Sequence, residues 1–316
     1  MGGIQQEKVV VIIGPTAVGK TKLSIDMAKA FDGEIISGDS MQVYREMDIG
    51  TAKVTKEEME GIPHYMIDIR DPDEPFSAAE FQQLVRMHIH DISKRGKLPI
   101  IVGGTGLYIQ SALYDYQFSE SPGDEAYRES LERLAETDGV GAVYDMLKHA
   151  DPQSAERIHP NNVRRVIRAL EIFHTTGKTM SETLEGQQQI LLYDTAIVGL
   201  TMARDKLYSR INQRVDLMME QGLLEEVKSL YDQGLHHCQS IQAIGYKELY
   251  AYFEGITTLE EAVEALKTNS RRYAKRQLTW FRNKMDVTWF DMTEGEKKEE
   301  IFSYVEGNLR LKANNT

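Results

Sequence analysis

Gly14-Pro15-Thr16-Ala17-Val18-Gly19-Lys20-Thr21 is the stretch that decides the fold of this chain. It matches the pattern G-x-x-x-x-G-K-[ST], a loop whose backbone N–H groups surround the phosphates of a ligand. Residues 9–13 before it prefer β-structure, and residues 22–31 after it carry apolar side chains at helical spacing. We therefore expect this phosphate loop to bind a di- or triphosphate, with Lys20 adding positive charge and the Thr21 hydroxyl holding Mg²⁺, rather than to form a glycine turn without a ligand.

Three further buried strands are predicted along the chain, at residues 34–37, 98–102 and 196–200. Residues 76–94 are predicted to form a helix that Ser77 caps. Alternating strands and helices are typical of a parallel sheet with both faces covered. The predicted fold class is α/β, a P-loop NTPase-like parallel sheet covered by helices.

A mostly helical insertion domain is predicted to interrupt this core. Between residues 117 and 189 the strand signals vanish, and helical spacing covers residues 125–136, 140–149 and 162–175. We place the core domain at residues 1–116 and 196–316, with helices toward its C-terminal end, and the insertion at residues 117–195. Residues 183–190 are polar and rich in glutamine, which predicts an exposed loop or hinge that returns to the core.

The chain of 316 residues is acidic overall, with a net charge of -12, but its basic residues are clustered. Residues 271–284 contain six basic side chains and no acid, and residues 157–168 contain four arginines. Each cluster suits either contact with a nucleic-acid backbone or a solvated helix face. Net charge alone therefore does not exclude a nucleic-acid partner.

Nothing in the sequence predicts a membrane or secreted protein. No apolar run approaches the roughly 18 residues that span a bilayer, and residues 1–8 lack the layout of a signal peptide. Cys238 is the only cysteine, which excludes an internal disulfide and a zinc site built on cysteines. We expect a cytoplasmic protein with no membrane partner, and a monomer.

A phosphate loop does not specify a reaction, because kinases, ATPases and GTPases share it. The strand at residues 98–102 ends in Gly103-Gly104-Thr105-Gly106 rather than in the acid that a mechanical ATPase uses. The acid that ends a strand is Asp39, after residues 35–38. Parallel strands present their carboxyl ends to the ligand crevice, so Asp39 should face the phosphate loop unless it only forms a turn or caps a helix.

Seven motifs, which span nearly the whole chain in order, resemble those of the tRNA dimethylallyltransferases, also called tRNA isopentenyltransferases. Besides the phosphate loop they are Asp39-Ser40-Met41-Gln42-Val43-Tyr44-Arg45, Asp48-Ile49-Gly50-Thr51-Ala52-Lys53, Gly103-Gly104-Thr105-Gly106-Leu107-Tyr108, His159-Pro160-Asn161-Asn162-Val163-Arg164-Arg165, Ala243-Ile244-Gly245-Tyr246-Lys247-Glu248 and Arg272-Tyr273-Ala274-Lys275-Arg276-Gln277-Leu278-Thr279-Trp280-Phe281-Arg282. Two positions depart from the family pattern: Val18 stands where serine is common, and Asn162 where aspartate is common. The lone Cys238 excludes the C-terminal zinc finger of eukaryotic relatives, so the resemblance is to the bacterial type.

The resemblance implies transfer of a dimethylallyl group from dimethylallyl diphosphate to N6 of the adenosine 3′-adjacent to the anticodon in tRNA, with release of diphosphate. The donor is expected in the phosphate loop. The resemblance also implies that the insertion domain contacts the anticodon stem-loop of tRNA. The residues that it assigns to tRNA contact are Asp39, Ser40, Met41, Gln42, Thr105, Arg128, Asn161, Asn162, Val163, Arg164 and Arg165.

The chemistry of such a transfer predicts a role for four residues. As the allyl–oxygen bond breaks, negative charge grows on the diphosphate, and cations there lower the barrier. Lys20 and Mg²⁺ on Thr21 supply two of them, and Arg276 is the predicted third, with a phosphate contact to tRNA as its alternative. The target base must leave its stack before it can be alkylated. Asp39 is the predicted acceptor of the proton that the amine loses.

Three other functions compete with this interpretation. An adenylate isopentenyltransferase would use the same donor with free AMP or ATP, but the insertion and the basic residues 271–284 favour a large acceptor. A small-molecule kinase would use Asp39 to activate a hydroxyl group, and it would consume ATP without any prenyl donor. A non-catalytic nucleotide-binding switch has no need of Asp39 beside an intact phosphate loop.

Overall fold

The computed structural model describes residues 6–118, 123–185 and 190–314. It contains two compact units, the first made of Met1–Tyr114 and Leu191–Thr316 and the second of Asp115–Ile190. The insertion predicted at residues 117–195 extends beyond the C-terminal end of the second unit, because a strand of the first unit begins at Asp194. Each unit has hydrophobic core residues of its own.

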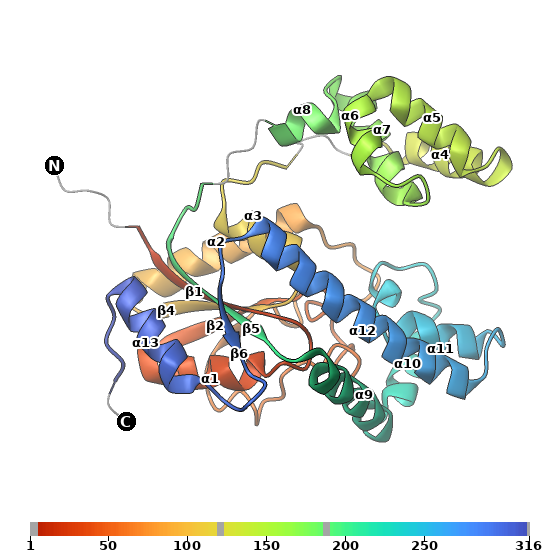
Figure 1. Cartoon of the computed structure of the whole chain (residues 1–316). Coiled ribbons are helices and arrows are strands. Elements are labelled where there is room, and N and C mark those ends of the chain that lie inside the picture. The colour runs from red at the N-terminus through yellow and green to blue at the C-terminus, as the bar shows by residue number, and fades with distance from the viewer. Residues whose placement is uncertain (1–5, 119–122, 186–189, 315–316) are drawn as a thin grey trace. The chain divides into compact units, whose positions relative to one another are not determined.

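The first unit is built on a six-stranded parallel sheet with the strand order β3-β2-β4-β1-β5-β6 (Figure 1). The strands are β1 (Lys8–Ile13), β2 (Gly33–Gly38), β3 (His64–Tyr65), β4 (Leu98–Gly103), β5 (Asp194–Thr201) and β6 (Thr288–Asp291). The predicted α/β class and parallel sheet are confirmed. The edge strands β3 and β6 were outside the prediction, because their 2 and 4 residues are too few to show a period.

The central strand β1 is buried on both faces of the sheet. Val9, Val11 and Ile13 belong to one hydrophobic cluster, and Val10 and Ile12 belong to another. Successive side chains of a strand point to opposite faces, so a strand covered on both sides has an uninterrupted apolar sequence. The position of β1 between β4 and β5 therefore explains the apolar run that precedes the phosphate loop.

Helices cover both faces of this sheet. The helices of the first unit are α1 (Lys20–Phe31), α2 (Ala78–Lys94), α3 (Gly106–Leu113), α9 (Arg204–Glu220), α10 (Leu223–Asp232), α11 (Tyr246–Phe253), α12 (Leu259–Lys284) and α13 (Lys298–Leu309), with a 3-10 turn η1 (Ser240–Gln242). Leu23 and Ile301 pack in one cluster, and Phe81 and Phe281 pack in the other. Ser77 caps α2 as predicted, because its side chain accepts a hydrogen bond from the backbone N–H of Glu80. The long helix α12 contacts both α3 and α11 (Figure 1).

The second unit is a small helical bundle in the described residues 115–118, 123–185 and 190. Its helices are α4 (Glu125–Thr137), α5 (Val140–Ala150), α6 (Pro152–Arg157), α7 (Val163–Thr176) and α8 (Met180–Glu185). Their apolar faces meet in a core that includes Leu131, Leu147 and Leu170. The side chain of Asp124 caps α4 by accepting a hydrogen bond from the N–H of Tyr127.

The prediction of an exposed loop at residues 183–190 is wrong for its first three residues. Residues 183–185 form the end of α8, and residues 186–189 lie outside the described chain. Thr179 and Glu182 explain the helix, because the threonine hydroxyl accepts from the Glu182 N–H at 3.1 Å and the glutamate accepts from the Thr179 N–H at 2.7 Å. This reciprocal capping starts a helix in a polar segment that has no apolar period.

Within the described ranges, every helix is too short or too polar to cross a membrane.

Candidate functional site

The phosphate loop connects β1 to α1 and has two positions that favour glycine. A Cβ atom on Gly14 would lie 2.6 Å from the carbonyl oxygen of Leu200 in β5. Gly19, at the N-terminus of α1, has a φ of 107°, a left-handed backbone conformation that glycine adopts readily because it has no Cβ atom. The helix begins at Lys20, earlier than the predicted residue 22, so its free N–H groups lie at the loop. A helix N-terminus of this kind binds phosphate groups.

The side chain of Lys20 folds back over its own loop. Its Nζ donates hydrogen bonds to the carbonyl oxygens of Gly14 and Pro15, at 3.0 and 2.8 Å. Burial lowers the pKa of Lys20 to about 7, the positive charge of Arg214 lowers it as well, and the negative charge of Asp39 acts in the opposite direction. Lys20 is therefore only partly protonated near pH 7, and a bound anion would favour its charged form.

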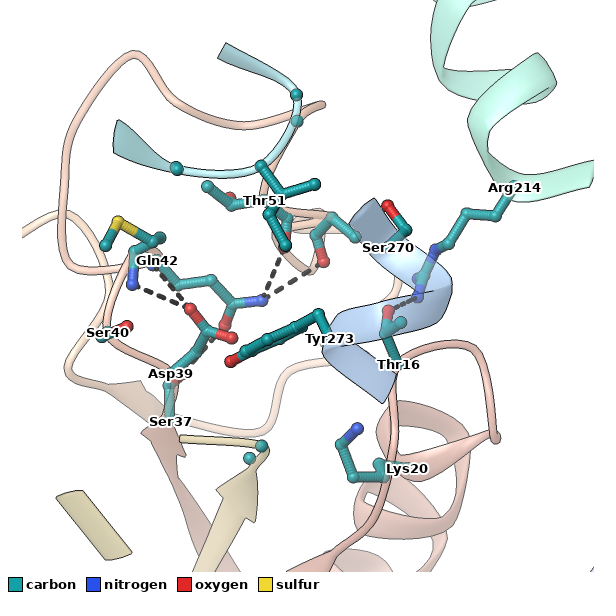
Figure 2. Close-up of a pocket in the computed structure, with 18 of the residues that line it drawn as sticks. Thr16, Lys20, Ser37, Asp39, Ser40, Gln42, Thr51, Arg214, Ser270 and Tyr273 are labelled. Atoms are coloured by element: carbon teal, nitrogen blue, oxygen red, sulfur yellow. Dashed lines mark hydrogen bonds between the residues drawn. The ribbon is translucent and has the colours of Figure 1, made fainter. Parts of the chain in front are cut away.

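A cavity of about 370 Å³ lies beside the phosphate loop within the first unit (Figure 2). Its walls come from the phosphate loop, the residues after β2, the end of β4, and the helices α9 and α12. The residues that line it include Thr16, Lys20, Thr21, Asp39, Ser40, Met41, Gln42, Gly50, Thr51, Arg214, Tyr273, Arg276 and Gln277. The strand ends of a parallel sheet meet at this edge, and for that reason Lys20 and Asp39 share one cavity.

Asp39 directly follows β2 and shows both features that were expected as alternatives. Its Oδ1 accepts hydrogen bonds from the N–H groups of Met41, at 2.8 Å, and Gln42, at 3.4 Å, and so supports a turn. Among the described residues, no hydrogen bond to its Oδ2 is present, so this oxygen is open to a ligand. Burial raises the pKa of Asp39, whereas the two backbone N–H groups and Lys20 lower it. A carboxylate with a raised pKa is a stronger proton acceptor than one at the surface.

The other predicted contact residues after β2 are held in place by neighbouring groups. The N–H of Ser40 donates to the hydroxyl of Thr105 at 3.1 Å, and Met41 lines the cavity. The amide of Gln42 is occupied at both ends: its Oε1 accepts from Ser37 Oγ at 2.8 Å, and its Nε2 donates to the carbonyl of Thr51 at 3.2 Å. Nε2 also donates to the carbonyl of Ala52 at 3.3 Å, so a base could accept from Nε2 only by replacing one of these partners, whereas Oε1 keeps a second lone pair.

Two arginines from different helices line the cavity. Arg276, which the sequence singles out, is exposed on α12, and its guanidinium lies 5.7 Å from the ring centre of Tyr273. Arg214 on α9 was outside the prediction. Its Nη1 donates to Thr16 Oγ1 at 3.4 Å, and burial lowers its pKa. Within the described chain Arg214 forms no salt bridge with an acid, so a phosphate group would suit it well.

Gln277 on α12 ties the phosphate loop to the end of β4. Its Oε1 accepts from the N–H of Thr16 at 3.1 Å, and its Nε2 donates to the carbonyl of Gly104 at 3.1 Å. Only 5% of Gln277 is exposed, and a Cβ atom on Gly104 would lie 2.0 Å from its Nε2. The amide therefore fixes the spacing between two loops that face the cavity. It can approach the second loop this closely because residue 104 is a glycine and has no side chain.

Comparison with known proteins decides the family. The family model described as IPP transferase matches residues 42–284. The chain belongs to this family. Among its curated relatives, the tRNA dimethylallyltransferase of Bacillus cereus (strain Q1) is 71% identical over 316 residues, with 100% of both chains covered. The tRNA dimethylallyltransferase of Bacillus cytotoxicus is 73% identical over 311 residues, with 98% of both chains covered.

Solved structures of IPP transferase relatives have the same fold. The tRNA isopentenylpyrophosphate transferase of Bacillus halodurans is 54% identical, with a TM-score of 0.72 over 96% of this chain and 99% of that one. A eukaryotic dimethylallyltransferase acting on tRNA is 34% identical, with a TM-score of 0.82 over 98% of this chain and 81% of that one.

In this IPP transferase, the remaining residues predicted to contact tRNA lie in the second unit. Arg164 and Arg165 are exposed in the first turn of α7, and Asn161, Asn162 and Val163 lie at its N-terminal end. Arg128, unlike Arg164 and Arg165, has an acidic partner within the bundle. Its Nη2 donates to Oε1 of Glu171 at 2.8 Å. Glu171 is fully buried and also accepts from Arg168 at 2.6 Å. The pairing indicates that Arg128 supports the fold of the bundle in addition to any contact with tRNA.

The sequence does contain a signal for Arg214 that the prediction did not use. Leu207, Ile211 and Val215 form the buried stripe of α9, and Arg214 stands beside Val215 near this stripe. A charged residue at the border of an apolar stripe is a candidate for a buried ligand contact. Gln277 gives the same signal on α12, next to the buried positions Ala274 and Phe281.

The donors available for a metal in this IPP transferase are few. Among the described residues, no three His, Cys, Asp or Glu side chains cluster as a metal site would require. Thr21 lines the cavity and offers one hydroxyl oxygen next to the phosphate loop. Mg²⁺ keeps several waters and is commonly held by one or two protein oxygens together with substrate phosphates. The Thr21 hydroxyl fits a metal of this kind, for which one protein oxygen is enough.

Proposed function

We propose that this chain transfers the dimethylallyl group of dimethylallyl diphosphate to N6 of the adenosine 3′-adjacent to the anticodon in tRNA. The observation that carries the proposal is that Lys20 and Asp39 line one cavity, which brings a cation that suits a phosphate group and a carboxylate that can accept a proton to the same space. Relatives that are 71% and 73% identical carry the name tRNA dimethylallyltransferase, which supports this reaction.

The diphosphate of the donor would lie in the phosphate loop. The free N–H groups of the phosphate loop and of the first turn of α1, together with the ammonium group of Lys20, bind its oxygens. Arg214 and Arg276 add positive charge from two helices that line the cavity. Mg²⁺, held on the protein side by Thr21, would neutralise further charge on the leaving group. These cations favour departure of the diphosphate because they act where negative charge develops.

The carboxylate of Asp39 would contact N6 of the acceptor adenosine and accept its proton. The bond between the allyl carbon and the diphosphate oxygen breaks, and its electron pair leaves with the diphosphate. The lone pair of N6 forms the new bond to carbon, and the proton that N6 loses passes to Asp39. Oδ2 is the oxygen for this step, because Oδ1 accepts two backbone N–H groups.

Binding of tRNA would use residues of both units. Ser40, Met41 and Thr105 are close to Asp39 and would surround the extruded base. Arg164 and Arg165 are exposed and suit phosphates of the anticodon stem-loop. We propose that residues 117–195 act as the tRNA-contacting insertion. A tRNA substrate implies a cytoplasmic protein, and we expect it to act as a monomer.

One experiment separates this function from its rivals. Radiolabelled dimethylallyl diphosphate is offered with Mg²⁺ to tRNA or to AMP, and the products are digested to nucleosides. We expect label on N6 of one adenosine in tRNA and none on AMP. Label on AMP alone would indicate an adenylate isopentenyltransferase. In a parallel incubation with ATP and no prenyl donor, consumption of ATP would indicate a kinase.

A further inference from the structure

Glu226 on α10 binds a loop that is distant in the sequence. Its Oε2 accepts hydrogen bonds from the N–H groups of Asp48, at 3.0 Å, and Ile49, at 2.8 Å. Its Oε1 accepts from the N–H of Gly50 at 3.0 Å. One carboxylate thus satisfies three consecutive backbone donors. Hydrogen bonds to an ionised acceptor are stronger than neutral ones, so the 48–52 loop is firmly held at this end.

A tyrosine fixes the same carboxylate from the other side. The hydroxyl of Tyr246, which is fully buried, donates to Oε1 of Glu226 at 2.6 Å. Burial and the charge of Glu226 raise the pKa of Tyr246, so the hydroxyl keeps its proton as a donor. The ring of Tyr246 also packs on the loop, because a Cβ atom on Gly50 would lie 2.5 Å from Cε2. Only a glycine allows this close approach.

The next residues of the 48–52 loop face the cavity and hold Gln42. The carbonyl oxygens of Thr51 and Ala52 accept from Gln42 Nε2 at 3.2 and 3.3 Å, as Figure 2 shows for the labelled Thr51. The other end of the amide accepts from Ser37, at the end of β2. The backbone N–H of Gln42 in turn donates to Asp39. Hydrogen bonds joined by the backbone of residues 50–52 and by Gln42 therefore connect Glu226 to the carboxylate that lines the cavity.

We propose that Glu226 is a positioning residue for prenyl transfer, which holds the 48–52 loop and through Gln42 the orientation of Asp39. This role rests on the proposed function of Asp39. Glu226 does not line the cavity, so it acts without touching either substrate. The carboxylate is suited to the task because two oxygens can accept several N–H groups, whereas the amide of a glutamine has only one acceptor oxygen.

The test compares Glu226→Gln with Glu225→Gln, its exposed neighbour on the same helix. Both variants remove one negative charge, but only the first removes acceptors from the 48–52 loop. Single-turnover transfer to tRNA is measured at saturating donor and acceptor, together with the affinity for dimethylallyl thiodiphosphate, an unreactive donor. For Glu226→Gln we expect a rate lower by about 10- to 100-fold and a donor affinity within a few-fold of the wild type, because displacement of a reacting group by about 1 Å has such an effect. For Glu225→Gln we expect both values unchanged.

A double-mutant cycle distinguishes positioning from general support of the fold. If Glu226 acts through Gln42, then Glu226→Gln added to Gln42→Ala lowers the rate by less than about threefold more, because the link is already broken. If the two residues act independently, their losses multiply, and the positioning role is wrong. Equal rates of Glu226→Gln and Glu225→Gln would also overturn it.

A second variant disturbs the 48–52 loop and leaves the side chain of Glu226 unaltered, and it decides the matter if Glu226→Gln loses donor binding through misfolding. Gly50→Ala forces the loop away from Tyr246, so we expect a slower transfer with donor affinity retained. A wild-type rate in Gly50→Ala would contradict the proposal. A wild-type enzyme that transfers nothing to tRNA would contradict the proposed function instead, so the two failures are distinct.

Discussion

Lys20 and Asp39 line one cavity and act on each other's protonation. Burial lowers the pKa of Lys20 to about 7 and raises the pKa of Asp39. The opposite charge of each residue resists the shift of the other. The cavity thus holds a cation and a carboxylate that are both sensitive to what binds between them.

The first prediction concerns the phosphate loop. Lys20→Ala should weaken donor binding by orders of magnitude and leave tRNA affinity nearly intact, because the loop binds the phosphates of the small substrate. Lys22→Ala is the matched control, since Lys22 is exposed on the same helix and pairs with Glu296 at 2.6 Å. Donor and tRNA affinities are measured separately. A parallel loss of tRNA binding in Lys20→Ala would argue against this assignment.

Donor affinity should fall as the pH rises above about 7, where free Lys20 loses its proton. A bound diphosphate favours the ammonium form and raises its pKa, so binding above pH 7 takes up a proton, and affinity drops by up to about tenfold per pH unit. The phosphate, with a second pKa of about 6, stays ionised over this range. Calorimetry at pH 7, 8 and 9 in two buffers measures the uptake. Lys20→Arg stays charged and should show a flat profile.

The base assignment predicts a selective loss of chemistry in Asp39→Asn. The amide oxygen can still accept from the N–H of Met41, but the side chain no longer takes a proton. General-base assistance is worth about 10² to 10⁴ in rate, so single-turnover transfer should fall by roughly that factor while donor affinity stays within a few-fold. Asp39→Ala should lose at least as much. A near wild-type rate at saturating substrates would mean that Asp39 only forms the turn.

The exposed arginines of α7 should dominate the salt dependence of tRNA binding. Replacing both Arg164 and Arg165 by Ala should reduce the slope of log affinity against log salt by roughly 0.7 to 0.9 for each tRNA phosphate that the protein no longer neutralises. Thermal stability should not change, because both side chains are exposed. Lys148→Ala in the same unit is the control, since Lys148 is paired with Asp145 at 2.8 Å. An unchanged slope would remove these arginines from the interface.

Arg128→Ala should behave differently, by destabilising the second unit. The variant leaves the buried Glu171 with one cationic partner fewer, and a hydrogen bond to a charged group contributes about 1.5 to 3 kcal/mol. Hydrogen bonds from Arg168 and Arg128 lower the pKa of Glu171 against the opposing effect of burial. Its contribution to stability is therefore present at neutral pH and is lost as the pH falls through the lowered pKa. Denaturant unfolding of the second unit at pH 7 and pH 4 measures both effects.

The features that could be predicted from consecutive residues are those that local geometry decides. All the groups that a phosphate loop needs lie within the consecutive residues 14–21. Asp39 directly follows a predicted strand. Because parallel strands end at the same edge of a sheet, the sequence position of Lys20 and Asp39 was enough to predict that they share a cavity. Three helices of the insertion, α4, α5 and α7, were predictable for a similar reason, since their apolar spacing is a property of each segment alone, whereas the six-residue helices α6 and α8 were not predicted.

Packing between distant segments decided the rest. Arg214, Gln277 and Glu226 are single polar residues on helices of ordinary amphipathic sequence, and no period connects them to the phosphate loop or to the 48–52 loop. Their partners are backbone and side-chain groups that approach only after α9, α10 and α12 have packed against the sheet. A hydrogen bond requires about 3 Å between two atoms, and only the tertiary structure brings atoms so far apart in sequence to that distance.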